Sequence, residues 1–213
     1  MPVDHLEAWL WATPNSRRVS LLFAELGLEY RVHPVNIRQR EQFAPEVLAL
    51  NPYGKLPIVR WREAGEERVL TESGAILLHF GAAVPALFPG EGMARAEVLQ
   101  WFMFAMTSLG PMTGQAHHWT ELAPEKPPAA RAHSVALARR AYDVLEARLE
   151  ETGAFLAGAH SLADIAAYPW VAVHDWAAIE LADFPATAAW LDRVAARPAT
   201  AAGMAVPHGA RLE

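Results

Sequence analysis

The chain has 213 residues, 53% of them hydrophobic, so it can bury a sizeable core in one large or two small domains. Its formal net charge of −6 disfavours nucleic acid and anionic membranes as main partners, because both attract a basic face. The chain contains no cysteine, which excludes a disulfide framework, a thiolate nucleophile and a cysteine zinc site. Any sulfur chemistry must therefore use sulfur that the substrate brings.

No apolar run approaches the roughly 18 residues that a membrane-spanning helix needs. The first residues also lack a basic segment followed by an apolar one, which is the pattern of a secretion signal. We therefore expect a soluble cytoplasmic protein with no membrane partner and no nucleic-acid partner.

The first 80 or so residues alternate between strand and helix patterns. The helix predicted at 16–26 carries one apolar stripe and ends at Gly27, the usual residue after a helix C-terminus. The order strand-helix-strand-helix-strand-strand-helix fits an open α/β layer with a mixed sheet. The predicted strands are 6–11, 30–35, 58–61 and 68–70, and the predicted helices are 16–26, 45–50 and 73–80. Residues 36–43 are predicted as a loop and 64–67 as a hairpin connection.

After a linker rich in Gly, Pro and Ala, no strand pattern appears, and helices are predicted at 94–119, 129–151, 162–176 and 186–196. Gly110-Pro111 should break or kink the first of these helices. Ser161 and Asp164 have the spacing of a capping box. The tail from Ala199 has no firm pattern. The fold class is therefore α/β plus all-α, with domains at 1–82 and 93–213 and a linker at 83–92.

Two features of the segment from Asn51 to Ser73 are chemically unusual. Leu56-Pro57 enters a strand through a proline, which has no N–H to donate. Glu72-Ser73 lies where a strand ends and an apolar helix begins. A helix N-terminus offers unpaired N–H groups and partial positive charge, so it suits a carboxylate. The residues alone leave two alternatives open: an ordinary trans proline at Leu56-Pro57, and a Glu72-Ser73 pair that serves only to start the helix.

Three separated motifs together resemble a glutathione transferase. They are Asn51-Pro52-x-Gly54-Lys55-Leu56-Pro57, Glu72-Ser73-Gly74-Ala75-Ile76 and Ser161-x-x-Asp164. Thr13-Pro14-Asn15, Gln42-Phe43, the segment 109–118 and Arg197-Pro198-Ala199-Thr200 are most similar to the bacterial Nu class, which has glutathione-dependent disulfide-bond reductase activity. The resemblance implies a thioredoxin-like N-terminal domain, a helical C-terminal domain, a homodimer, a cis peptide at Leu56-Pro57 and a part in detoxification.

Glutathione fits these residues physically. Ser73 can donate a hydroxyl and a backbone N–H to the γ-glutamyl carboxylate, and Glu72 can pair with the ammonium group. A cis turn would turn the backbone of Leu56 and Pro57 outward to pair with the cysteinyl backbone. Lys55 is a candidate for the glycyl carboxylate, or else a solvated surface lysine. The resemblance assigns a further peptide contact to Gln42. We expect no metal.

A glutathione thiol needs help to ionise, because a free thiol has a pKa near about 8.5. Hydroxyl and amide donors at a helix N-terminus lower that value. Thr13 and Asn15 stand before the first predicted helix, and our hypothesis is that both donate to the sulfur of glutathione. The alternative is that either residue caps the helix, for which both types are preferred. Ser16 is the competing hydroxyl.

With no protein cysteine, disulfide reduction would use two glutathione molecules, one to attack and one to resolve. In the Nu class an arginine of the long second-domain helix helps to hold the second molecule. Here His133 stands at that place, with Arg131 two residues earlier, so we expect weaker or pH-dependent binding of oxidised glutathione. Conjugation of glutathione to electrophiles and a glutathione-binding scaffold without catalysis are the alternative functions.

Overall fold

The computed structural model describes residues 4–209, which form two compact units. The first unit joins residues up to 84 with those from 197 onward, and the second runs from 85 to 196. Residues 1–3 and 210–213, where the predicted domains begin and end, lie outside the described residues. The prediction placed the whole C-terminal segment in the helical domain, whereas residues 197–209 belong with the N-terminal unit.

A four-stranded mixed sheet organises the first unit, in the order β2-β1-β3-β4. β1 pairs parallel to β2 and antiparallel to β3, and β4 returns antiparallel beside β3. The strands and α-helices of this unit are β1 (Asp4–Leu10), α1 (Pro14–Glu25), β2 (Arg31–Pro34), α2 (Pro45–Leu48), β3 (Ile58–Glu63), β4 (Glu66–Thr71), α3 (Ser73–Gly81) and α9 (Pro198–Met204). The α/β layer with a mixed sheet is therefore confirmed.

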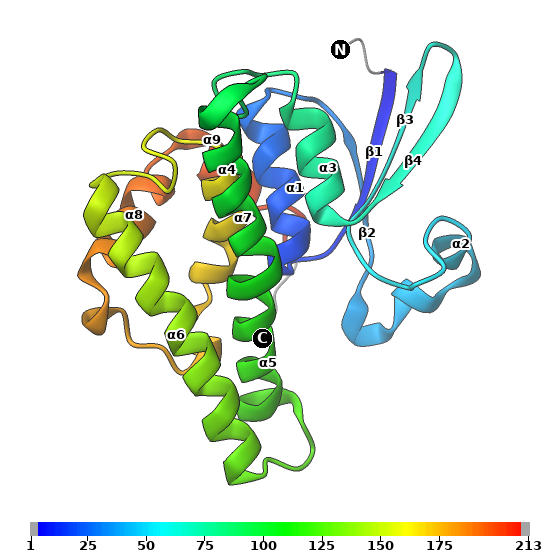
Figure 1. Cartoon of the computed structure of the whole chain (residues 1–213). Coiled ribbons are helices and arrows are strands. Elements are labelled where there is room, and N and C mark those ends of the chain that lie inside the picture. The colour runs from blue at the N-terminus through cyan, green and yellow to red at the C-terminus, as the bar shows by residue number, and fades with distance from the viewer. Residues whose placement is uncertain (1–3, 210–213) are drawn as a thin grey trace. The chain divides into compact units, whose positions relative to one another are not determined.

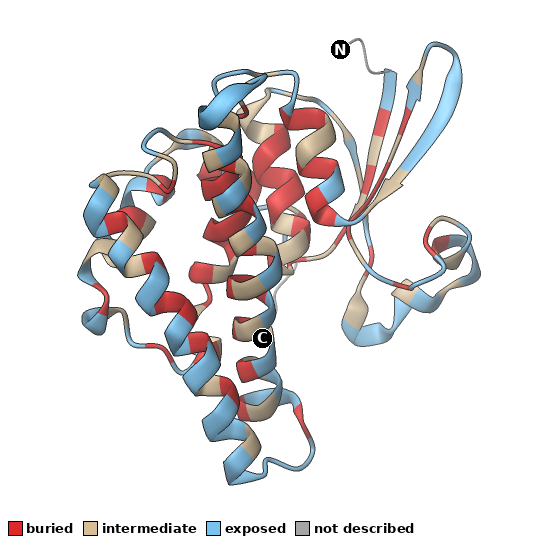
Figure 2. Ribbon diagram, in the orientation of Figure 1, coloured by how far each residue is buried: buried red, intermediate tan, exposed pale blue. Residues whose placement is uncertain are grey.

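Helices α1 and α3 lie side by side on one face of the sheet (Figure 1). Their facing side chains form the main core, in which the rings of Phe23 and Phe80 meet edge to face with centroids 5.0 Å apart. Figure 2 shows many buried residues along these two helices. A smaller cluster of Val35, Val47 and Ile58 packs α2 against the sheet. Because α1 and α3 pack together in this core, it sets where their N-termini lie.

Turn chemistry sets the ends of the first-unit elements. Thr13 caps α1 with its side chain, and Gly27 follows the helix with φ of +62°. Ala64 and Gly65 both have positive φ, as a two-residue hairpin turn between β3 and β4 requires. The loop predicted at 36–43 holds two short 3-10 helices, η1 (Ile37–Gln39) and η2 (Glu41–Phe43).

The second unit is helical throughout its regular elements. It contains α4 (Gly92–Phe104), η3 (Ala105–Leu109), α5 (Gly110–His117), η4 (His118–Leu122), α6 (Pro128–Thr152), α7 (Leu162–Val171), η5 (His174–Ala177), η6 (Leu181–Asp183) and α8 (Pro185–Ala195). Among the helices of residues 4–209, none combines the length and apolar character that crossing a membrane requires.

The predicted break or kink at Gly110-Pro111 takes the form of a π-helical turn, and the chain stays helical on both sides of it. η3 is a wider π-helical turn, in which the Gly110 N–H donates to the carbonyl of Ala105. This one-turn widening accommodates a proline that has no N–H of its own, so α4 and α5 run on through it. The helix predicted at 162–176 also differs, since α7 ends at Val171 and a 3-10 turn follows.

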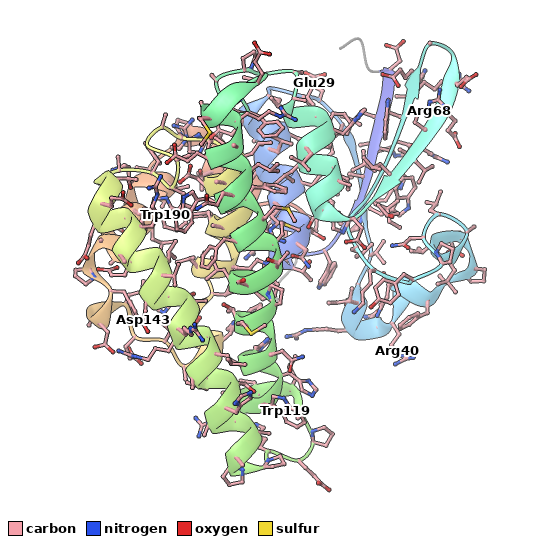
Figure 3. All side chains as sticks on the ribbon, in the orientation of Figure 1. Glu29, Arg40, Arg68, Trp119, Asp143 and Trp190 are labelled. Atoms are coloured by element: carbon pink, nitrogen blue, oxygen red, sulfur yellow. The ribbon has the colours of Figure 1, made fainter. Side chains whose placement is uncertain are left out.

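The capping box at Ser161 and Asp164 is confirmed and is built into the core. The carboxylate of Asp164 accepts from the backbone N–H groups of Leu156 and Ser161, each at 3.0 Å, and from the indole of Trp190 at 2.8 Å. Trp190 is buried among the helices of this unit (Figure 3). Asp164 therefore ties the start of α7 to α8.

Candidate functional site

The loop before β3 presents a cis peptide at Leu56-Pro57, which matches the bond that the resemblance implies. Buried Asn51 holds this loop, because its amide donates to the carbonyl of Lys55 at 2.8 Å and its Oδ1 accepts from the Tyr53 N–H at 3.1 Å. Gly54 has φ of +63°, and a Cβ there would lie 2.7 Å from the ring of Phe43. A side chain at residue 54 is therefore disfavoured by the backbone conformation, and it would also require the exposed ring of Phe43 to move.

The start of α3 follows directly from the end of β4. Glu72 stands at the N-cap with φ of 66° and ψ of 113°, a conformation that costs a non-glycine residue about 1–3 kcal/mol. Its side chain makes no cap hydrogen bond and is exposed. Ser73 begins the helix and is buried. The strained turn leaves the carboxylate of Glu72 outside and the first N–H groups of α3 beside it.

A small polar pocket of about 200 Å³ connects this helix start with the cis-proline loop and with α1. It brings together six of the predicted site residues from three separate segments. Its lining residues are Asn15, Asn51, Tyr53, Lys55, Leu56, Pro57, Glu72 and Ser73. The pocket thus offers backbone groups, two amides, two hydroxyls, one cation and one carboxylate within a space that suits part of a peptide-like ligand.

Thr13 is the N-cap residue of α1. Its Oγ1 accepts from the backbone N–H of Ser16 at 3.3 Å and lies 3.2 Å from the Ser16 hydroxyl oxygen. The hydroxyl of Ser16 also accepts from the backbone N–H of Trp11 at 3.3 Å, and Ser16 is buried. The capping arrangement is therefore present, and the hydroxyl of Ser16 is engaged with the backbone before α1.

Arg18 is the polar residue that the sequence reasoning missed. Only 2% of it is exposed, and its Nη1 lies 2.8 Å from Oδ1 of Asn15 and 3.4 Å from Oγ of Ser73. Burial lowers the pKa of Arg18 to about 9, which leaves it protonated at neutral pH. A cation therefore lies behind the pocket and favours an anionic ligand. The available signal was its position four residues before Leu22, on the apolar face of α1.

The other predicted residues lie at more exposed places. Lys55 is exposed, with its Nζ 5.6 Å from the centre of the Tyr53 ring. Gln42 is half-buried, and its backbone carbonyl lies 3.5 Å from the Cβ position of Gly54, so η2 flanks the cis-proline loop. His133 is exposed on α6 in the second unit, as is Arg131. Among the predicted site residues, all of which lie in the described part of the chain, Thr13, Gln42 and His133 do not line the small pocket.

This arrangement is suited to holding a charged peptide and polarising a group on it. Unpaired N–H groups at a helix start, a buried guanidinium and an amide all favour negative charge. An exposed carboxylate beside them favours a cation such as an α-ammonium group. Within the described part of the chain, no three His, Cys, Asp or Glu side chains gather as a metal site would need.

Each of the two units contains a segment that matches a known family model. Residues 12–83 match the family model of the glutathione S-transferase N-terminal domain, and residues 99–198 match that of the glutathione S-transferase C-terminal domain. The disulfide-bond oxidoreductase YfcG of Escherichia coli K12 is 36% identical over 198 residues, which cover 92% of each chain. The disulfide-bond oxidoreductase YghU of the same bacterium is 26% identical over 94% of this chain and 74% of its own.

Solved structures show the same similarity. A glutathione transferase from Burkholderia graminis, with two glutathione molecules bound per subunit, has a TM-score of 0.88 at 34% identity. The match covers 97% of this chain and 90% of that one. A glutathione transferase from Pseudomonas putida, with one glutathione disulfide bound per subunit, has a TM-score of 0.88 at 30% identity, over 96% of this chain and 92% of that one.

Proposed function

The chain belongs to the glutathione S-transferase family, and on that premise we propose that it is a glutathione-dependent disulfide-bond oxidoreductase. The relatives named as disulfide-bond oxidoreductases support this choice. The observation that carries it is the small polar pocket in a chain that contains no cysteine. Both thiols of the reaction then come from glutathione.

In this proposal, different residues of the pocket and its surroundings contact different parts of glutathione. The γ-glutamyl carboxylate accepts from Ser73 and from the N–H groups at the start of α3, where the helix dipole also favours it. The ammonium group pairs with Glu72. The cysteinyl backbone pairs with Leu56 ahead of Pro57, and Lys55 and Gln42 serve the glycyl end. Support for this assignment comes from the shared lining by Leu56, Glu72 and Ser73.

Asn15 and Thr13 stabilise the glutathione thiolate in this proposal. Asn15 lines the pocket, and its amide is a donor that becomes more favourable as the sulfur gains charge. Thr13 lies two residues earlier at the same helix end, where its hydroxyl has to turn from Ser16 to reach a sulfur. We therefore assign the larger share of the effect to Asn15.

The reaction is two successive thiol–disulfide exchanges. The first glutathione thiolate attacks one sulfur of the substrate disulfide, which gives a mixed disulfide and releases the other sulfur as a thiolate that takes up a proton. The thiolate of a second glutathione then attacks the glutathione sulfur of the mixed disulfide. Oxidised glutathione and the second substrate thiol result. Two glutathione thiols are oxidised and one substrate disulfide is reduced.

The second glutathione contact at His133 remains a proposal from the resemblance, as do the homodimer, the Nu class, the cytoplasmic location and a part in detoxification. The relatives that hold two glutathione molecules or one glutathione disulfide support a site for two thiols. Calorimetric titration of the wild type and of His133→Ala with oxidised glutathione tests the histidine, and equal affinities would remove it from the site.

The decisive assay compares two reactions of the same purified protein with glutathione. Reduction of bis(hydroxyethyl) disulfide should proceed well above the uncatalysed rate, and conjugation to chlorodinitrobenzene should be the slower reaction. A faster conjugation would favour the ordinary transferase activity. Retention on immobilised glutathione without either reaction would indicate a binding scaffold.

We predict that Asn15→Ala lowers kcat/KM for disulfide reduction about 10- to 1000-fold, as removal of one anion-stabilising donor does. Thr13→Ala should cost less, and part of its effect should be lost helix stability. Steady-state kinetics together with thermal unfolding separates the two effects. Asn36→Ala, at the cap of η1, is the matched control. Unchanged turnover in both site variants would remove the thiolate assignment.

A further inference from the structure

Arg18 joins two polar side chains of the pocket from beneath. Its Nη1 reaches Oδ1 of Asn15 on α1 and Oγ of Ser73 on α3, two residues that come from different elements. We propose that Arg18 is a positioning residue that turns the amide of Asn15 and the hydroxyl of Ser73 so that each presents a donor to glutathione. This inference rests on the proposed function, since it concerns the same pocket.

The chemistry of the guanidinium group gives the direction. Arginine has five N–H donors and no acceptor, so any group that faces it at hydrogen-bond distance must present an acceptor. At 2.8 Å from Arg18, the amide of Asn15 therefore presents its oxygen to the cation. The amide nitrogen stands on the other branch of the same planar group and is turned away from Arg18. Asn15 also lines the pocket, so an anion bound there lies on the side to which this donor end can be directed.

The same rule applies to Ser73, at a longer distance of 3.4 Å. Its oxygen faces Nη1, so the hydroxyl proton is left to rotate toward another acceptor. The γ-glutamyl carboxylate, at the start of α3, is such an acceptor in the proposed binding mode. One buried cation would thus set the donor direction both for the group that holds the carboxylate and for the group that stabilises the sulfur.

Two other roles for Arg18 give different results. As a plain structural support, Arg18 would change stability without changing the thiol. As a direct electrostatic partner, it would stabilise the thiolate whether or not Asn15 is present. As a positioning residue, it would act on the thiol only through Asn15. The orientation role is therefore tested by a double-mutant cycle.

The experiment measures the pKa of the glutathione thiol bound to the protein, from thiolate absorbance across a pH titration, along with kcat and KM for disulfide reduction. Arg18→Met should raise the thiol pKa and lower kcat/KM about 10- to 100-fold, the cost typical of losing a group that orients a ligand. Arg18→Lys keeps a cation that only donates, so it should retain more of the wild-type thiol pKa than Arg18→Met does.

In the Asn15→Ala background, Arg18→Met should change the thiol pKa little further. A full additional shift in that background would show a direct charge effect and overturn the proposal, as would a folded Arg18→Met protein with a wild-type thiol pKa. If Arg18→Met does not fold, Arg18→Gln carries the test, because it fills similar space and can accept as well as donate. The matched control is Arg148→Met, which removes a mostly buried arginine that pairs with Glu97 and Glu151 in the second unit.

The outcome also separates this inference from the proposed function. If Asn15→Ala itself leaves the thiol pKa and turnover unchanged, the thiolate assignment fails. If Asn15→Ala has its expected effect and Arg18 acts independently of it, the proposed function stands and only the positioning role is lost.

Discussion

Glu7 is a carboxylate of the sheet that contacts side chains on both neighbouring strands. Its Oε2 accepts from Nε and Nη2 of Arg60 at 2.9 and 2.5 Å, and its Oε1 lies 3.0 Å from Nε2 of His33. These hydrogen bonds, with Arg60 as the largest cause, hold the pKa of Glu7 below its ordinary value. Glu7 lies on β1, Arg60 on β3 and His33 on β2, so this group of three side chains connects three neighbouring strands.

The depressed pKa predicts a pH-dependent contribution to stability. Because the folded value lies below the unfolded one, the ionised carboxylate stabilises the protein above about pH 4.5, and this contribution is lost as the pH falls through the folded pKa. Glu7→Gln should lower the free energy of unfolding by about 1–2 kcal/mol at neutral pH. The deficit should shrink as the pH falls through the folded pKa of Glu7, measured by urea unfolding across an acidic pH series.

Glu67→Gln is the control for this prediction, because Glu67 is well exposed and lies 3.8 Å from the same arginine. An exposed pair of this kind contributes about 0–1 kcal/mol. A Glu7→Gln deficit that stayed the same at acidic pH would show that lost packing, and not the ionised pair, causes the destabilisation.

At the scale of residues, the sequence predicts those site positions whose chemistry is local. Leu56-Pro57 and Glu72-Ser73 were recognisable because proline before a strand and a polar pair before an apolar helix are unusual in themselves. Arg18 was not recognisable in this way. An arginine on a helix is usually exposed, whereas Arg18 is buried and contacts Ser73, which lies far along the chain on another helix.

At the scale of elements, α9 shows where pattern reading fails. Its sequence from Pro198 to Met204 consists largely of small residues and has no apolar stripe to mark a helix. The same small residues allow α9 to pack closely on α1. Ser20 on α1 donates its hydroxyl to the carbonyl of Gly203 at 2.7 Å. By contrast, α1 and α6 carry longer amphipathic patterns, and both were predicted to within about two residues.

The contact at Gly203 predicts a large effect from one methyl group. A Cβ on Gly203 would lie 2.4 Å from Cα of Leu21 and 2.9 Å from the carbonyl oxygen of Ser20. Alanine favours a helix over glycine by about 1 kcal/mol, but here the clash is with backbone atoms, which cannot rotate away. Gly203→Ala should therefore lower the free energy of unfolding by about 1–3 kcal/mol.

Urea unfolding checks this prediction, and glutathione affinity extends it, because α1 also carries Asn15 and Arg18. A displaced α1 should weaken glutathione binding in proportion to the structural change. Gly90→Ala is the matched control, since a Cβ at Gly90 would meet nothing within 4 Å. Wild-type stability for Gly203→Ala would mean that α9 can shift without cost.

At the scale of the whole molecule, the order of elements and the two-domain character follow from the change of periodicity near residue 84. The return of the C-terminal segment to the first unit does not, because nothing local in residues 197–209 indicates which unit they join. That assignment depends on complementary surfaces of α1 and α9, above all the small residue at Gly203. Long-range packing of this kind leaves little trace in a single sequence.

The absence of cysteine from the whole chain predicts a strict requirement for the reductant. An enzyme with its own cysteine pair could be kept turning over by any thiol that reduces the pair. Under the proposed mechanism the reducing thiol must itself be bound, and the pocket lined by Asn15, Leu56 and Ser73 would hold it through its peptide backbone and carboxylate groups. Dithiothreitol has neither group. Glutathione should therefore support reduction of bis(hydroxyethyl) disulfide well above the uncatalysed rate, whereas dithiothreitol should give the uncatalysed rate alone.

The measurement follows loss of the substrate disulfide at equal concentrations of thiolate from each reductant, with and without protein. Comparison at equal thiolate removes the intrinsic difference between the two thiols. With glutathione, one molecule of oxidised glutathione should form for each disulfide consumed. Protein-dependent acceleration by dithiothreitol would contradict the requirement, since it would mean that the protein acts on the substrate disulfide and not by activating bound glutathione.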